Sequence, residues 1–242
     1  MKNSTASIQA IADRVEALPW QRIYSDLEHH GFAITDRLFD VDECQKLIGM
    51  YTDSSLFRKQ VIMQDHSYGR GEYQYFAYPL PEIVYSLRQS MYSQLVAIAN
   101  QWHTSLKRSI FPATLSEFSK SCHMGGQTKP TALLLKYEAE DYNCLHQDLY
   151  GELTFPLQVA ILLSDPDRDF AGGEFVLTEQ RVRKQSKVEV VRLQQGQAVI
   201  FAVNHKPVPS KRGISRVNIK HGVSRILSGQ RFCLGVIFHD AK

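Results

Sequence analysis

Four polar side chains in the C-terminal half have the types and spacing of a metal site with an anchor for a carboxylate ligand. His146 and Asp148 stand in the segment HQD, His221 follows far downstream, and Arg231 comes ten residues after it. Two imidazoles and one carboxylate on one face of an iron ion leave its other positions open, as in non-haem Fe(II) oxygenases. Arginine can hold a carboxylate through two parallel hydrogen bonds. The four residues therefore indicate a reaction class as well as a metal.

The three metal-ligand candidates lie where their side chains could converge. His146 and Asp148 are two residues apart, so on an extended segment both side chains point to the same face. His221 ends the segment SRVNIKH, where alternation places Ser215, Val217, Ile219 and His221 on one face. A surface pair and a core histidine are the structural alternatives, so a further ligand-binding residue is needed to favour a site.

Arg231 supplies that argument. In RFCLGVIFH it shares a face with Cys233 and Gly235, which leave room beside it. A buried arginine costs several kcal/mol unless a carboxylate meets it, and that carboxylate could belong to a ligand or to a protein Asp or Glu. Tyr137, nine residues before His146 in TALLLKYE, could donate its hydroxyl to the same carboxylate, or it could be a core residue.

Strand-like segments after residue 130 must position these side chains. They are TALLLKYE, FPLQVAILLS, GEFVLTEQ, KVEVVRL, QAVIFAV, SRVNIKHGV and RFCLGVIFH. Short β-branched runs separated by turn signals such as DPDRDFAGG, QQGQ and PSKRG predict an antiparallel sandwich or barrel.

The chain before residue 130 is predicted to be mainly helical. Helix signals predict two helices over residues 4–30, starting at Ser4 or Thr5, broken at Pro19 and stopped by Gly31. We expect a short strand over 32–35, a helix from Asp40 to about Tyr51, and a long helix from Pro81 to about Leu106. Helices first and strands second give an α+β fold, in which N-terminal helices brace a double-stranded β-helix (jelly roll) core.

The segment FRKQVIMQDHSYGRGEYQYFAYPLP is aromatic and glycine-punctuated, and it predicts a hairpin or a long loop. Its rings could pack under the barrel or form a lid that faces the substrate. Residues in loops and at strand ends should rim the barrel. The substrate-contact candidates are Tyr68, Arg70, Tyr73, Tyr75, Tyr150, Asn204 and Arg216.

Length and composition favour one globular domain over residues 1–242. We expect 1–129 to be helical support with a substrate loop, and 130–242 to be the jelly-roll catalytic core. Hydrophobic residues make up 43% of the chain and charged residues 22%, which argues against disorder.

The chain is expected to be cytoplasmic, with no membrane partner. No apolar run approaches the roughly 20 residues that span a bilayer, and charged residues interrupt the N-terminal segment, unlike a secretory signal. Cys44, Cys122, Cys144 and Cys233 form no CxxC pair and are interpreted as reduced, mostly buried thiols.

Basic residues cluster in the region 181–231, although the net charge is only +3. A solvated face and a surface for an anionic partner, including nucleic acid, both fit this pattern. A small molecule, a protein or a nucleic acid could therefore be the substrate. The basic residues are Arg181, Arg183, Lys184, Lys187, Arg192, Lys206, Lys211, Arg212, Arg216, Lys220, Arg225 and Arg231.

The ordered motifs over about residues 131–239 resemble the prolyl-4-hydroxylase-like group of Fe(II)/2-oxoglutarate-dependent dioxygenases. The motifs are LLLKY ending at Tyr137, HQD from His146, AGGEFVL, QQGQAVIF, and HGVSRILSGQR from His221 to Arg231. Arginine stands where many prolyl hydroxylases have lysine. The whole chain also resembles a bacterial oxygenase family suggested to demethylate damaged DNA oxidatively, through GEYQYFAYPLP, CHMGGQTKPT and VNHKPVPSKRG. The ten-residue spacing before Arg231 is shorter than in AlkB-type demethylases.

The resemblance implies cofactors and roles. Fe(II) would be held by His146, Asp148 and His221, and 2-oxoglutarate would be anchored by Arg231 with Tyr137. Dioxygen would be the second co-substrate and ascorbate a candidate reductant. The reaction would release succinate and carbon dioxide and hydroxylate a C–H bond, and hydroxylation of an N-methyl group would lead to demethylation. A protein prolyl hydroxylase and a non-catalytic jelly roll that binds nucleic acid are the alternatives.

Overall fold

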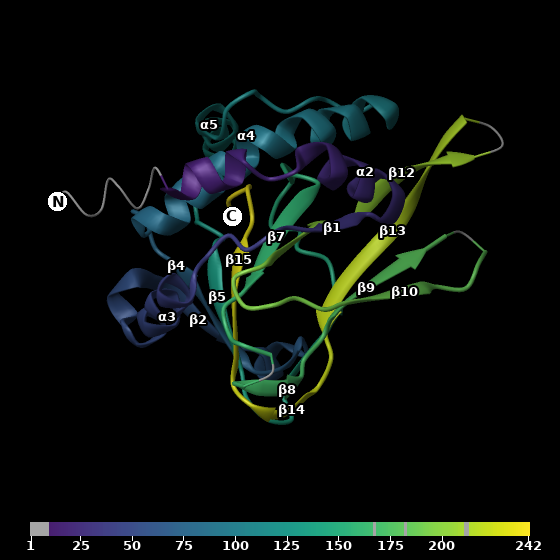
Figure 1. The fold of residues 1–242 in the computed structure, drawn as a ribbon. Helices are drawn as coiled ribbons and strands as arrows, with labels where there is room; N and C mark the ends of the chain where they lie inside the picture. Colours follow the sequence, from purple (N-terminus) through teal and green to yellow (C-terminus); the bar gives the residue numbers. More distant parts are fainter. Residues whose placement is uncertain (1–9, 167, 182, 211–212) are drawn as a thin grey trace.

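Two antiparallel sheets form the centre of the molecule. The computed structural model describes residues 10–166, 168–181, 183–210 and 213–242. Figure 1 shows helices α2 (Trp20–His30), α4 (Glu82–Ser105) and α5 (Leu115–Met124) along the top of the strands, and helix α3 (Val41–Gly49) at the lower left beside strand β2. The larger sheet has the order β1 (Phe32–Ile34), β11 (Ala198–Ala202), β7 (Leu157–Leu162), β15 (Arg231–Val236), β5 (Leu133–Tyr137), β4 (Glu72–Phe76) and β2 (Phe57–Ile62).

The second sheet carries two of the metal-ligand candidates. Its order is β10 (Lys187–Val191), β9 (Phe175–Gln180), β13 (Gly213–Val223), β6 (Tyr142–His146) and β3 (Gly69–Arg70), with β12 (His205–Ser210) also paired to β13. A short ladder joins β14 (Ile226–Gly229) to β8 (Phe170–Gly172). The α+β jelly-roll prediction is confirmed.

Burial follows the alternation that the sequence predicts. On β13, Val217, Ile219 and His221 are buried, whereas the side chains between them are exposed. Ser215, predicted on the same face, is exposed, so the buried part of the strand begins at Val217. Every residue of β7 and β11 is buried, as expected for strands covered on both faces. One hydrophobic core joins these strands to the helices.

Helix α2 (Trp20–His30) ends at Gly31, whose φ of +81° is the left-handed conformation of a helix stop. Residues 10–16 are also helical, and the predicted start at Ser4 or Thr5 lies outside the described residues. Helix α3 (Val41–Gly49) begins after Asp40, which forms a capping box with Glu43.

Helix α4 (Glu82–Ser105) begins one residue later than predicted, because Pro81 is its N-cap rather than its first residue. Helix α5 (Leu115–Met124) was not predicted. Its start carries a capping box between Thr114 and Glu117, so the sequence contained a signal for it. Among the described residues, no helix is both long and apolar enough to cross a membrane.

The aromatic segment before α4 is a hairpin rather than a long loop. Strand β2 pairs with β4, and β4 pairs with β5, so the region before residue 130 supplies two strands at one edge of the larger sheet. Phe76 packs in the core, whereas Tyr73 and Tyr75 enter a cavity. Packing in the core therefore describes Phe76, whereas Tyr73 and Tyr75 lie where a substrate could reach them.

Candidate metal centre and its cavity

Pairing of β6 with β13 brings the two imidazoles together. His146 lies directly opposite His221 in the ladder, and their ring centroids are 4.2 Å apart. Asp148 follows β6 by two residues. Its carboxylate oxygens lie 3.6 Å from His146 Nε2 and 3.3 Å from His221 Nε2. The three side chains offer ligand atoms within 4.8 Å of one another.

Backbone contacts orient the HQD segment. His146 Nδ1 lies 2.7 Å from the carbonyl oxygen of Cys144, and because a carbonyl only accepts, Nδ1 carries the proton. The lone pair on Nε2 is thereby directed toward Asp148 and His221. Gln147 Nε2 donates to the carbonyl oxygen of Ile219 at 2.7 Å and ties the segment to β13.

His221 is held as a neutral imidazole. Its ring is buried and lies 4.7 Å from the Phe201 ring and 5.8 Å from the Phe175 ring, centroid to centroid. Burial, together with the charge of His146, lowers the pKa of His221. A neutral imidazole is the form that binds metals.

Asp148 is held as a carboxylate despite its burial. Burial alone would raise its pKa, but the interactions with His221 and His146 hold the pKa below its usual range. Tyr150 also donates its hydroxyl to Asp148 Oδ1 at 2.7 Å. Two imidazoles and one carboxylate are a donor set that fits a non-haem Fe(II) ion.

Arg231 is a buried cation that lines the same cavity as the ligand set. Its exposed fraction is 3%, and its Nε atom has no hydrogen-bond partner. Over the described ranges, no Asp or Glu forms an ion pair with it, so the alternative of a protein carboxylate partner is not supported. Its guanidinium carbon lies 5.7 Å from the centre of the Tyr137 ring. A buried unpaired charge is costly, and the site therefore fits an anionic ligand.

Tyr137 lies beside Arg231 with its hydroxyl free to donate. Asn143 Nδ2 donates to the Tyr137 hydroxyl oxygen at 3.4 Å. Burial raises the pKa of Tyr137, so the hydroxyl keeps its proton. The arrangement allows Arg231 and Tyr137 to bind one carboxylate together.

Gly173, in the AGG turn, makes space for Arg231. It has a φ of +64°, and a Cβ there would lie 2.2 Å from Ile226 Cδ1 and 3.0 Å from Arg231 Cδ. Any larger residue would be strained and would press on the arginine.

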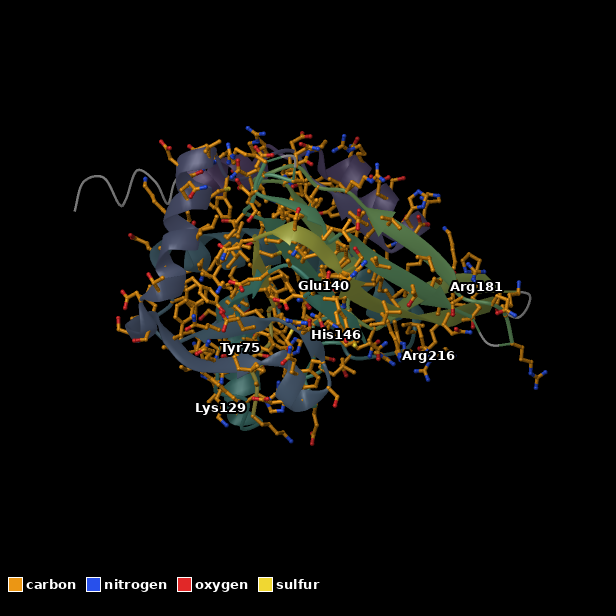
Figure 2. All side chains as sticks on the ribbon, turned by 90° about the horizontal axis from the view of Figure 1, so that it is seen from below. Tyr75, Lys129, Glu140, His146, Arg181 and Arg216 are labelled. Atoms are coloured by element: carbon orange, nitrogen blue, oxygen red, sulfur yellow. The ribbon has the colours of Figure 1, made fainter. Side chains whose placement is uncertain are left out.

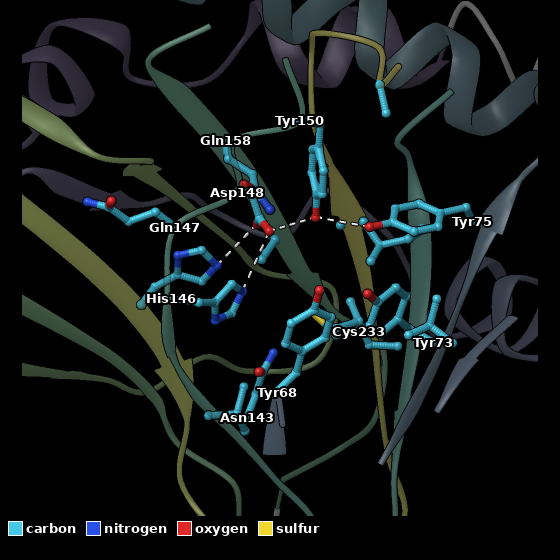
Figure 3. Close-up of a pocket in the computed structure, with 18 of the residues that line it drawn as sticks. Tyr68, Tyr73, Tyr75, Asn143, His146, Gln147, Asp148, Tyr150, Gln158 and Cys233 are labelled. Carbon is cyan, nitrogen blue, oxygen red and sulfur yellow. Dashed lines mark hydrogen bonds and ion pairs between the residues drawn. The ribbon is translucent and has the colours of Figure 1, made fainter. Parts of the chain in front are cut away.

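A cavity of about 660 Å³ contains the ligand set, Arg231 and Tyr137. Four tyrosine side chains also enter it, and Figure 3 shows their hydroxyls turned toward its interior. Tyr75 donates to Tyr150 at 3.0 Å, and Tyr150 donates to Asp148, which links the tyrosines to the ligand set. These four tyrosines, Tyr68, Tyr73, Tyr75 and Tyr150, were substrate-contact candidates.

Three other substrate-contact candidates lie outside this cavity. Arg70 forms an ion pair with Asp141 at 3.1 Å and lines a separate hollow. Asn204 borders a space of about 20 Å³ next to α4. Arg216 lies on the exposed face of β13. The β4 residues Tyr73 and Tyr75 line the cavity, whereas none of these three side chains does.

Several cavity residues were not singled out in the sequence. Asn143 contacts Tyr137, and Gln158, on β7, has a buried side-chain oxygen without a partner. Arg58, Lys59 and Lys129 line the same cavity. Arg58 and Lys59 lie on β2 and Lys129 lies far along the chain, so the sequence alone did not group them.

The basic region 181–231 does not form one surface. Lys206 is buried and donates to the carbonyl oxygens of Glu28 and His29, and Arg231 is in the cavity. Arg225 pairs with Glu140. Lys211 and Arg212 lie outside the described residues.

The predicted thiols are free, and three of the four are buried. Cys144, on β6, is the exposed one, so the prediction of mostly buried thiols is confirmed. Its neighbour on the strand, Asn143, turns inward, so Cys144 faces solvent.

The family model of Oxygenase-NA, described as "Oxygenase, catalysing oxidative methylation of damaged DNA", matches residues 71–241. Two uncharacterized proteins from two strains of Mycobacterium tuberculosis are 45% identical over 190 residues, covering 76% of this chain and 82% of theirs.

Solved structures share the fold at low identity. A Pseudomonas putida prolyl-4-hydroxylase aligns with a TM-score of 0.55 and 13% identity, covering 92% of this chain and all of that chain. A Burkholderia pseudomallei oxidoreductase of the 2OG-Fe(II) oxygenase family aligns with a TM-score of 0.51 and 15% identity, covering 92% of each.

Proposed function

This chain belongs to the Oxygenase-NA family and has the fold of 2-oxoglutarate- and Fe(II)-dependent oxygenases, and from that premise we propose that it hydroxylates, or oxidatively demethylates, its substrate while 2-oxoglutarate is converted to succinate and carbon dioxide. The family model confirms that the predicted class is an oxygenase, and its dependence on 2-oxoglutarate is part of the proposal. One observation carries the proposal: an unpaired buried Arg231 shares a cavity with a His-Asp-His ligand set.

The metal would be held by His146, Asp148 and His221. An Fe(II) ion bound there supplies dioxygen activation, with ascorbate as a candidate reductant that keeps it ferrous. The protein's own contribution is to fix the ligand atoms, since the Cys144 carbonyl orients one imidazole and Tyr150 holds the carboxylate.

Arg231 and Tyr137 would bind the far carboxylate of 2-oxoglutarate. The guanidinium can make two parallel hydrogen bonds, and the tyrosine hydroxyl can add a third. Leu133 and Leu135, on the same strand as Tyr137, also line the cavity. They would exclude water from the bound co-substrate and fix its position relative to the metal.

Nucleic acid is the first candidate substrate, because the family description names damaged DNA. Hydroxylation of an N-methyl group gives a product that collapses to the amine and formaldehyde. Hydroxylation and oxidative demethylation would therefore use the same residues in the same positions.

Protein prolyl hydroxylation is the alternative that the Pseudomonas putida structure suggests. It predicts that a proline-containing partner gains the mass of one oxygen atom. A non-catalytic module that binds nucleic acid through the basic residues is the other alternative. It predicts nucleic-acid affinity with no iron bound and no succinate formed.

Succinate release tests the proposal. Protein loaded anaerobically with Fe(II) and then given 2-oxoglutarate and oxygen should release succinate slowly without substrate, and His146→Ala should release none. His29→Ala, an exposed histidine on α2, is the matched control and should behave like the wild type. Full activity in His146→Ala would contradict the site assignment. Screening methylated nucleic acids, peptides and metabolites for faster succinate release would then identify the substrate class.

A further inference from the structure

The mouth of the cavity carries positive charge. Arg58 and Lys59 on β2, with Lys129 just before β5, line the cavity and are here called the cationic rim. The only carboxylate side chain among the lining residues is Asp148, which belongs to the ligand set. The cavity is therefore electropositive on this side. Of the basic residues in the region 181–231, only Arg231 lines the cavity.

The rim charges are not neutralised by the protein. Among the residues that the structure describes, no carboxylate pairs with Arg58, Lys59 or Lys129, and both lysines are exposed. Arg58 donates from Nε to the carbonyl oxygen of Pro130 at 2.8 Å. Lys242 also lines the cavity, but it lies 3.5 Å from Glu152, so we exclude it from the rim.

Aromatic rings continue the rim toward the metal centre. Lys59 lies opposite Tyr75 in the β2–β4 ladder, and the Arg58 guanidinium lies 4.5 Å from the centre of the Tyr75 ring. From Tyr75 the hydroxyl contacts pass through Tyr150 to Asp148. Cations and stacking rings thus lie along one path from the surface to the ligand set.

We propose that the cationic rim binds the phosphates of a single-stranded nucleic acid, while the tyrosine rings of the cavity receive one base beside the metal. This inference rests on the proposed function. Binding of single strands typically combines a positive groove for the backbone with aromatic side chains on which bases stack, and the cavity offers both. An acidic peptide would use the cations but has no ring to stack on the tyrosines.

The cationic rim is better placed to bind phosphates near the metal centre than the basic residues of two hairpins, β9–β10 and β12–β13, which are here called the basic hairpins. In Figure 2, Tyr75 and Lys129 lie on one side of His146, whereas Arg181 and Arg216 lie on the other. Neither Arg181 nor Arg216 lines the cavity, and Arg181 pairs with Glu179. A strand held by the rim passes directly over the opening of the cavity.

Fluorescence anisotropy with a short single-stranded oligonucleotide that contains an N-methylated base tests the proposal. The protein is loaded anaerobically with Fe(II) and 2-oxoglutarate, so that binding is measured without turnover. Lys59→Glu/Lys129→Glu is compared with Arg216→Glu/Lys220→Glu, which makes the same change in charge on the exposed face of β13. The rim variant should bind at least about tenfold more weakly. The negative slope of the logarithm of the association constant against the logarithm of the salt concentration should become less steep by about 1.4, because two phosphate contacts are lost.

Other outcomes would overturn the proposal. Weak binding of the β13 variant with normal binding of the rim variant would place the nucleic acid on the hairpins. Competition by poly-glutamate as strong as by unlabelled oligonucleotide would indicate an acidic peptide, and competition by a free mononucleotide as strong as by the strand would indicate a nucleotide substrate. Wild-type protein that releases succinate without binding the oligonucleotide would refute this inference alone. Binding without any succinate release would instead refute the proposed function.

Discussion

Arg231 lies directly opposite Tyr137 in the ladder between β15 and β5, and both side chains enter the cavity of the His-Asp-His ligand set. Partners in an antiparallel pair stand about 5 Å apart, so strand register alone brings the two groups together. One carboxylate can then meet a guanidinium and a hydroxyl. The register of one strand pair therefore determines the position of the proposed co-substrate.

Substitution of Gly173 should damage both the fold and this anchor. Gly173→Ala places a methyl group against Ile226 and Arg231 in a backbone conformation with positive φ. We expect the free energy of unfolding to fall by about 1–3 kcal/mol, measured by urea denaturation. Gly49→Ala is the control, because a Cβ at Gly49 meets nothing within 4 Å. Equal stability of both variants would show that Gly173 is not required for packing.

The Tyr150 hydroxyl should strengthen metal binding. Tyr150→Phe removes the donor to Asp148 Oδ1 but keeps the ring. Loss of a group that orients a metal ligand typically weakens metal binding by about 10–100-fold. Titration with Mn(II), which is stable in air, measures the effect. Tyr85→Phe, on the exposed side of α4, should leave the affinity unchanged, and the same affinity in both variants would refute this role for Tyr150.

His239 should make the protein less stable in acid. It is fully buried, the backbone N–H of Phe155 donates to its Nδ1, and burial lowers its pKa from 6.5 to about 4. The unfolded chain therefore takes up the proton first, so the contribution of this residue to stability is complete above about pH 6.5 and is lost as the pH falls toward 4. At pH 4 the free energy of unfolding has fallen by about 3 kcal/mol through this residue.

His239→Asn tests this contribution, since its side-chain oxygen can still accept from the Phe155 N–H. Urea unfolding at neutral and acidic pH should show a smaller loss of stability in the variant than in the wild type. His29→Asn, at an exposed histidine, should follow the wild type. Identical pH profiles for all three proteins would show that His239 is not the group responsible.

The inward faces of the site strands were predictable from the sequence, because a strand alternates sides with every residue. Val217, Ile219 and His221 are buried together, as are Arg231 and Cys233. Local signals also identified the stop at Gly31 and the cap at Asp40. These features depend only on neighbours along the chain.

Features that depend on distant pairing were not predictable in this way. Strand β6 was missed because it is short and none of its residues is fully buried, and it becomes a strand by pairing with β13 and β3. Strand β12 contains two prolines, which an edge strand tolerates. The hairpin of β2 and β4 was one of the predicted alternatives, but the cationic rim also contains Lys129, which lies far from β2 in the sequence and which no hairpin signal places beside it.

Anaerobic calorimetry of Fe(II) binding, followed by 2-oxoglutarate binding, tests the central claim most directly. The wild type should bind one Fe(II) ion per chain and then 2-oxoglutarate. His146→Ala should lose the iron, whereas Arg231→Gln should keep it and bind 2-oxoglutarate about 10–100-fold more weakly, as expected for loss of about 1.5–3 kcal/mol from a charged hydrogen bond. Normal iron binding by His146→Ala, or normal 2-oxoglutarate affinity in Arg231→Gln, would contradict the account.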